Sequence, residues 1–184
     1  ILRLVEKINR SNLTVLLEGE TGTGKTLIAR AVHLSSPRAQ GPFVTVDCAA
    51  LPDNLLESEL FGYMKGSFTG AAIDKKGLFE EADGGTIFLD EIGRAGLTVQ
   101  RRLLHLLDKG EVRPIGSNSY RKLDVRVICA TSSKDLRHDV AQGAGEAARI
   151  LADLALADAR FLVVVHELDR IFDGQDVDAA PPVD

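Results

Sequence analysis

The sequence has few aromatic side chains and no excess of positive charge. Aromatic residues make up 5% of its 184 residues, tryptophan is missing, and the formal net charge is −5. Stacking on single-stranded nucleic acid needs aromatic platforms, and a general grip on phosphate backbones needs many lysines and arginines. We therefore do not expect this chain to bind nucleic acid by itself, and any contact with DNA falls to a domain outside it.

The scarcity of cysteines, histidines and long apolar runs excludes further classes of protein. The two cysteines, Cys48 and Cys129, lie far apart and form no C-x-x-C pair, and the four histidines lack metal-ligand spacing. This pattern argues against a disulfide framework or a cysteine metal site and favours buried thiols in a reducing compartment. No apolar run is long enough to cross a membrane, and the chain starts at Ile1 without a secretory signal pattern. We expect a cytoplasmic domain cut from a longer protein.

What the sequence does contain is a glycine-rich segment that fits a phosphate-binding loop. It matches the pattern G-x-x-x-x-G-K-[S/T] at every fixed position, between the apolar run Val15–Leu17 and a helical segment, Leu27–Leu34. This strand–loop–helix context is what the motif requires, because main-chain N–H groups and the positive end of the helix then converge on an anionic phosphate chain. The candidate nucleotide-binding residues are Gly19, Glu20, Thr21, Gly22, Thr23, Gly24, Lys25 and Thr26.

Four side chains are candidates for the chemistry of ATP and Mg²⁺. Lys25 is placed to reach the β- and γ-phosphates, and the hydroxyl of Thr26 to ligate Mg²⁺. A second apolar run, Thr86–Leu89, ends in Asp90 and Glu91. Asp90 is suited to hold Mg²⁺, and Glu91 to polarise the water that attacks the γ-phosphate. Lys25, Asp90 and Glu91 are therefore the predicted catalytic residues.

Apolar runs alternate with helical patterns along the chain. This alternation predicts an α/β fold with a parallel sheet covered on both faces and a nucleotide at the carboxyl ends of the strands. A glycine-rich loop is expected over residues 62–72. The predicted strands are 14–17, 43–46, 86–89, 125–130 and 161–165, and the predicted helices are 1–9, 27–34, 55–60, 78–82, 99–107, 134–140 and 147–157.

Two further segments resemble the AAA+ ATPase domain of bacterial sigma-54-dependent transcriptional activators. Residues 59–71 read ELFGYMKGSFTGA, where that family carries a GAFTGA surface loop, and residues 84–93 read GGTIFLDEIG, close to its acidic strand. The resemblance covers about residues 1–142. It implies a P-loop NTPase fold of the AAA+ class, a three-layer sandwich around a parallel sheet, with ATP and Mg²⁺ as cofactors.

The resemblance also implies partners and further site residues. The family assembles into a ring, taken as a hexamer, and remodels RNA polymerase holoenzyme that carries sigma-54. Phe68 and Thr69 would lie at the tip of the loop and touch the sigma factor. Thr131 would sense the γ-phosphate. The implied partner-binding residues are Gly66, Ser67, Phe68, Thr69, Gly70 and Ala71.

Three single positions depart from the pattern of the family. Thr26 stands where many of these activators carry glutamate. Asp47 replaces an asparagine that holds the catalytic glutamate, so we expect it to repel Glu91 when both are ionised. Ser132 replaces the asparagine that follows Thr131, and its shorter hydroxyl would reach the phosphate through water. We expect these changes to affect the rate of ATP hydrolysis and the nucleotide-dependent switch of the catalytic glutamate rather than nucleotide binding.

The largest departure begins at residue 143. Residues 143–184 show neither the arginine-bearing segment that reaches a neighbour's ATP nor a helical lid, and Arg149, Arg160 and Arg170 do not align with the finger positions. Two functions follow. One is an ATP-hydrolysing domain that acts on the sigma-54 holoenzyme through the GSFTGA loop. The other is a nucleotide-binding regulatory module with little or no ATPase activity.

Overall fold

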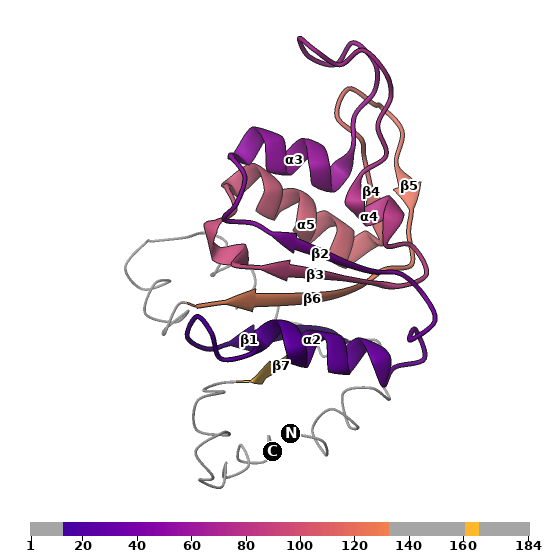
Figure 1. The fold of residues 1–184 in the computed structure, drawn as a ribbon. Coiled ribbons are helices and arrows are strands. Elements are labelled where there is room, and N and C mark those ends of the chain that lie inside the picture. The colour runs from indigo at the N-terminus through magenta and orange to yellow at the C-terminus, as the bar shows by residue number, and fades with distance from the viewer. Residues whose placement is uncertain (1–12, 133–160, 166–184) are drawn as a thin grey trace, which may run out of the picture.

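The central feature of the fold is a sheet of five parallel strands (Figure 1). The computed structural model describes residues 13–132 and the backbone of residues 161–165. The strand order is β2-β3-β6-β1-β7. The strands are β1 (Thr14–Glu18), β2 (Phe43–Asp47), β3 (Thr86–Asp90), β6 (Arg126–Thr131) and β7 (Phe161–Val165).

The register of the sheet brings polar strand ends together. Glu18 lies opposite Thr131 on the neighbouring strand, and Asp47 lies opposite Asp90. Because all pairs are parallel, these residues share the carboxyl edge of the sheet. The edge is where ligands bind in open α/β sheets.

Helices cover both faces of the sheet. Helix α2 (Lys25–Leu34) packs on one face, and α3 (Asp53–Phe61), α4 (Leu78–Glu81) and α5 (Leu97–Lys109) pack on the other. Side chains of a strand alternate between the faces. In β3, Ile87 and Leu89 therefore enter the cluster with α3 and α5, whereas Phe88 enters the cluster with α2.

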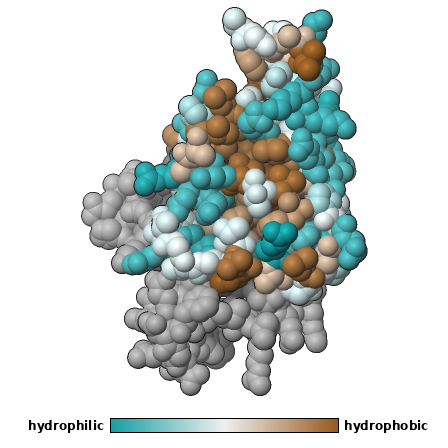
Figure 2. Space-filling model, viewed as in Figure 1, coloured by the Kyte–Doolittle hydropathy of each residue, from teal (hydrophilic) through white to brown (hydrophobic). Residues whose placement is uncertain are grey.

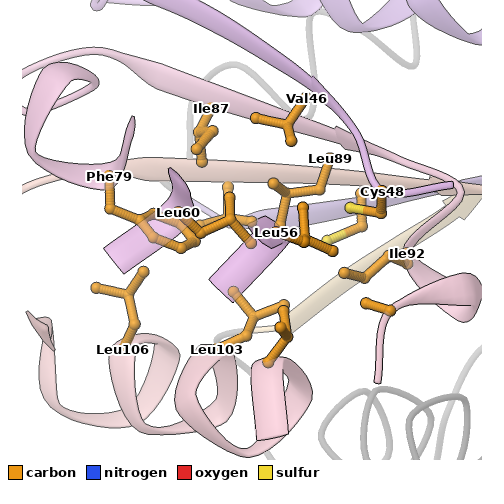
Figure 3. Close-up of a cluster of buried hydrophobic side chains, with 14 of the residues drawn as sticks. Val46, Cys48, Leu56, Leu60, Phe79, Ile87, Leu89, Ile92, Leu103 and Leu106 are labelled. Atoms are coloured by element: carbon orange, nitrogen blue, oxygen red, sulfur yellow. The ribbon is translucent and has the colours of Figure 1, made fainter. Parts of the chain in front are cut away.

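The larger cluster is tightly filled. Figure 3 shows Val46, Ile87 and Leu89 of the sheet facing side chains of α3, α4 and α5. The side chains of Leu56, Leu60 and Phe79 have no exposed surface. The two clusters confirm the predicted three-layer arrangement.

The predicted strands and helices agree with the described elements to within two residues at most ends. Helix α5 stops at Gly110, which adopts a left-handed conformation with φ of 68°, as its sequence position predicts. The edge strand 161–165 is confirmed and pairs with β1. Sequence patterns missed the short helix η1 (Ile92–Arg94) and the two-residue strands β4 (Glu111–Val112) and β5 (Arg121–Lys122), because such short elements show no periodicity.

Some sequence-based expectations lie outside the described residues. These are the helices expected over residues 1–9, 134–140 and 147–157 and the lid and arginines sought after residue 142. In the part of the chain that the structure describes, no helix combines the length and apolar character needed to cross a bilayer.

A long connection between α3 and α4, residues 62–77, projects beyond the helical layer (Figure 1). Its two arms touch at the base, where Tyr63 bridges Lys75 in antiparallel fashion and Ile115 of the β4–β5 hairpin in parallel fashion. A Cβ added to Gly77 would lie 2.5 Å from the main-chain nitrogen of Gly62, so no side chain fits there. The base of the loop is therefore a closely packed junction of three segments.

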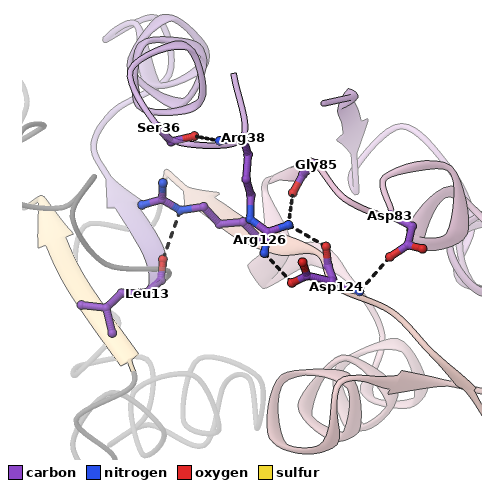
Figure 4. A network of polar contacts seen from close by, with 7 residues as sticks. All are labelled: Leu13, Ser36, Arg38, Asp83, Gly85, Asp124 and Arg126. Carbon is purple, nitrogen blue, oxygen red and sulfur yellow. Dashed lines mark hydrogen bonds and ion pairs between the residues drawn. The ribbon is translucent and has the colours of Figure 1, made fainter. Parts of the chain in front are cut away.

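Arginines hold the opposite, amino-terminal edge of the sheet (Figure 4). Arg38 donates to the carbonyl oxygens of Asp124 at 2.7 Å and Gly85 at 3.4 Å, and its guanidinium pairs with the Asp124 carboxylate. The buried Arg126 donates through Nε to the carbonyl of Leu13 at 3.4 Å. These contacts join segments that precede β1, β3 and β6, at the edge of the sheet away from the candidate site.

The two cysteines are predicted to be inert toward thiol reagents in the folded chain. Cys48 and Cys129 are 2% and 1% exposed. Burial, helped by the charges of Asp47, Asp90 and Glu91, raises the pKa of Cys48 to about 12, and burial also raises the pKa of Cys129. At pH 8 roughly one Cys48 thiol in ten thousand is ionised. We expect no reaction with an aromatic disulfide reagent over an hour, and two equivalents of reaction in guanidinium chloride. One fast equivalent in buffer would contradict this.

Candidate functional site

The phosphate-binding loop occupies the turn between β1 and α2, as predicted. Gly22 and Gly24 have positive φ values of 91° and 80°, and Gly24 is the residue that precedes the first turn of α2. Such angles favour glycine. The loop therefore exposes main-chain N–H groups at the amino end of a ten-residue helix, which is a favourable place for an anion.

Lys25 folds back onto this loop. Its ammonium donates to the carbonyl oxygen of Gly19 at 2.9 Å and to that of Glu20 at 3.0 Å, and the residue is 6% exposed. An ammonium has three N–H donors. One donor therefore remains for a further acceptor such as a phosphate oxygen.

Asp90 lies at the end of β3 within a cluster of charges. Burial raises its pKa, while the N–H of Glu91, which donates to Asp90 Oδ1 at 3.0 Å, and the charge of Lys25 lower it. The charges of Glu91 and Asp47 add to the rise. The structure thus brings the predicted catalytic residues Lys25, Asp90 and Glu91 to one edge of the sheet.

Glu91 has an unusual backbone. With φ of 50° it is the one non-glycine residue of positive φ in the described part of the chain, and such conformations cost energy that surrounding contacts must offset. Its carboxylate accepts hydrogen bonds from the N–H and hydroxyl of Ser132. The sequence pattern predicts that the Ser132 hydroxyl reaches the phosphate through water, and it does not predict this contact with Glu91.

Asp47 does not contact Glu91 through a hydrogen bond. Its Oδ1 accepts a hydrogen bond from the N–H of Ala49 at 2.9 Å, two residues along its own chain. The charge of Asp47 also helps to raise the pKa of Asp90, which lies opposite Asp47 in the sheet.

Thr131 borders the phosphate loop from the neighbouring strand. It is 2% exposed, and its carbonyl oxygen accepts a hydrogen bond from the N–H of Gly19 at 3.3 Å. A Cβ added to Gly93 would lie 3.4 Å from the Thr131 hydroxyl. Thr131 therefore lies between the phosphate loop and the segment that follows Glu91.

The donor set suits a magnesium ion shared with phosphate oxygens and water. Thr26 is exposed in the first turn of α2, and Asp90 is partly buried at the end of β3. Within the described ranges, no cluster of three or more His, Cys, Asp and Glu side chains could hold a metal ion by itself. Magnesium in nucleotide sites takes only one or two protein ligands and completes its shell with phosphate and water, so these residues fit that ion.

The candidate partner-binding residues 66–71 form the tip of the projecting loop. The tip is closed by a hydrogen bond from the N–H of Gly66 to the carbonyl of Ala71 at 2.8 Å. Phe68 is 44% exposed and its ring meets the edge of the Tyr63 ring, with centroids 4.9 Å apart. Thr69 is exposed, whereas Ala71 is 5% exposed. Figure 2 shows hydrophobic and polar residues mixed at the outer end of this loop.

The comparisons with known proteins agree with one another. A family model described as "Sigma-54 interaction domain" matches residues 1–148. The Nif-specific regulatory protein of Enterobacter agglomerans is 53% identical over 140 residues, which are 76% of this chain and 27% of that protein. The anaerobic nitric oxide reductase transcription regulator NorR of Escherichia fergusonii is 50% identical over 150 residues, 82% of this chain and 29% of that protein. The chain thus spans less than a third of these relatives.

Solved structures show the same fold. NtrX from Brucella abortus in complex with ATP has a TM-score of 0.75 and 32% identity, covering 90% of this chain and 35% of that one. The P-loop NTPase domain of the sigma-54 transport activator from E. coli has a TM-score of 0.54 and 18% identity, covering 91% and 92%. The second likeness concerns the fold alone, which is that of a P-loop NTPase.

Proposed function

Because this chain belongs to the sigma-54 interaction domain family, we propose that it binds MgATP at its phosphate loop and hydrolyses it. The observation that carries the proposal is the meeting of Lys25, Asp90 and Glu91 beside the loop at the carboxyl edge of the sheet. A relative of similar fold, NtrX, has been solved with ATP. The nucleotide is therefore the ligand class that fits both the geometry and the family.

The residues have distinct roles in this proposal. Bound MgATP supplies the phosphoanhydride to be cleaved and, through its cation, screening of the phosphate charge. Lys25 uses its remaining N–H to hold a phosphate oxygen. The N–H groups of Gly22 and of residues 24–26 orient the phosphate chain, whereas that of Thr23 is bonded to the Glu20 carbonyl. Thr26 and Asp90 are the residues that would hold Mg²⁺. Glu91 polarises a water molecule and accepts its proton.

The partner of the loop tip is the sigma-54 RNA polymerase holoenzyme. Phe68 and Thr69 are exposed at the end of a loop that stands clear of the helices, and Gly66 and Gly70 flank them with positive φ. An exposed aromatic between glycines is an uncommon choice for a surface without a partner. We place the working protein in the bacterial cytoplasm as a hexameric ring, with promoter DNA bound by a domain outside this chain.

A second candidate is a nucleotide-binding module with little or no ATPase activity. It is favoured by residues 143–184, in which no arginine aligns with the finger positions of the family. Arginine fingers contribute orders of magnitude to the rate of phosphoryl transfer. A chain without them retains binding and loses most of its turnover.

ATP turnover measured against protein concentration separates the two candidates. With Glu91→Ala as the blank, we expect the rate per subunit to rise steeply with concentration, because active sites are completed between neighbours. A fluorescent ATP analogue measures binding in the same samples. Binding with turnover at the level of the blank at every concentration would favour the second candidate, and no binding would overturn both.

A further inference from the structure

The Glu91 carboxylate is anchored through one of its two oxygens. Oε2 accepts a hydrogen bond from the main-chain N–H of Ser132 at 3.2 Å and a second from the Ser132 hydroxyl at 2.9 Å. In residues 13–132, no protein group donates a hydrogen bond to Oε1. One oxygen is held twice, and the other is available to a small polar molecule.

The sheet fixes the position of both partners. Glu91 directly follows β3 and Ser132 directly follows β6, and these strands are neighbours with Leu89 opposite Cys129. The carbonyl oxygen of Glu91 also accepts a hydrogen bond from the N–H of Arg94 at 2.9 Å, which starts η1. Two strand ends and a helical turn therefore set the separation of Glu91 from Ser132.

Asp47, on the other side of β3, cannot serve the same purpose. It lies opposite Asp90 in the register, and its own Oδ1 is engaged by the N–H of Ala49. An ionised carboxylate has no donor to offer, so Asp47 contributes only charge. The donors that reach Glu91 come from Ser132.

We propose that Ser132 is the positioning residue of Glu91, holding Oε2 so that Oε1 faces the attacking water. This inference rests on the proposed role of Glu91 in hydrolysis. A side chain held at one atom loses much of its rotational freedom before the water arrives, and such pre-organisation lowers the barrier. Hydrogen bonds to a charged group are also stronger than those between neutral groups.

Substitution of Ser132 tests the positioning role. We expect Ser132→Ala to lower kcat for ATP roughly tenfold, because one charge-assisted hydrogen bond is lost, and to leave the Kd of a fluorescent ATP analogue within about twofold. Ser132→Thr keeps a hydroxyl and is expected to restore most of kcat. A kcat for Ser132→Ala equal to or above that of the unchanged chain would overturn the inference, as would a Ser132→Thr variant as slow as Ser132→Ala.

A second measurement does not depend on turnover. The N–H of Ser132 donates to Glu91. In protein without added nucleotide, Glu91→Ala should therefore move the amide proton resonance of Ser132 upfield and speed the exchange of that proton with solvent. Asp47→Ala is the matched control, because it also removes a carboxylate beside β3, and it should leave both quantities unchanged. Equal effects of the two variants would overturn the inference. If the unchanged chain shows no ATP turnover, the proposed function fails. The comparison of Glu91→Ala with Asp47→Ala still shows whether Ser132 contacts Glu91.

Discussion

A chain with alanine at position 25 is expected to lose ATP binding and ATP turnover, each by at least about a hundredfold. Lys25 is 6% exposed, its ammonium donates to the carbonyls of Gly19 and Glu20, and its positive charge lowers the pKa of Asp90. Its removal takes away a hydrogen-bond donor to the phosphate and also the positive charge beside Asp90. Titration with a fluorescent ATP analogue and a phosphate-release assay measure the two losses.

The matched control for this change is Lys109→Ala. Lys109 ends α5, its side chain is 59% exposed, and its ion-pair partner is the adjacent Asp108. Exposed pairs of this kind contribute little, so we expect binding and turnover to stay within twofold. If Lys25→Ala and Lys109→Ala bind the ATP analogue with equal affinity, Lys25 is not part of the nucleotide site.

Replacement of Thr69 by alanine should separate ATP hydrolysis from transcription activation. Thr69 is exposed at the loop tip, whereas Asp90 and Glu91 lie at the carboxyl edge of the sheet. We expect turnover within about twofold of the unchanged chain and a loss of open-promoter formation by at least about fiftyfold, since hot-spot contacts at an interface dominate its energy. Promoter opening is read with purified sigma-54 polymerase, in the context of the whole activator.

Thr98→Ala is the control for that experiment. Thr98 is another exposed threonine, in the first turn of α5 and outside the loop. It should leave both activities intact. Parallel loss of hydrolysis and activation in Thr69→Ala would show that the loop tip supports the site itself rather than a partner contact.

The layered sheet could be predicted from sequence because each of its strands carries a local signal. The run Thr86–Leu89 is fully buried on both faces, and strands of that kind appear as continuous apolar segments bounded by polar residues. The phosphate loop was predicted for a similar reason, because its spacing is contained in eight consecutive residues. The P-loop fold is confirmed by the comparisons, and so is the family, which was inferred from residues 59–71 and 84–93.

Contacts between distant segments could not be predicted in this way. The bond between Ser132 and Glu91 joins residues 41 positions apart, and it exists because β6 lies next to β3 in the sheet. No local pattern encodes that order of strands. The turn of Asp47 toward Ala49, and the ring contact of Phe68 with Tyr63, likewise depend on backbone paths that the sequence spacing leaves open.

The junction at the base of the projecting loop has a mechanical consequence. Gly62 and Gly77 touch without room for a side chain, and Tyr63 is bridged on both sides, so the arms cannot slide past each other. We therefore infer that the base of the loop moves together with helices α3 and α4, which flank it in the sequence. A small rotation of these helices would then displace Phe68 and Thr69, at the tip of the loop, further than it displaces the base of the loop.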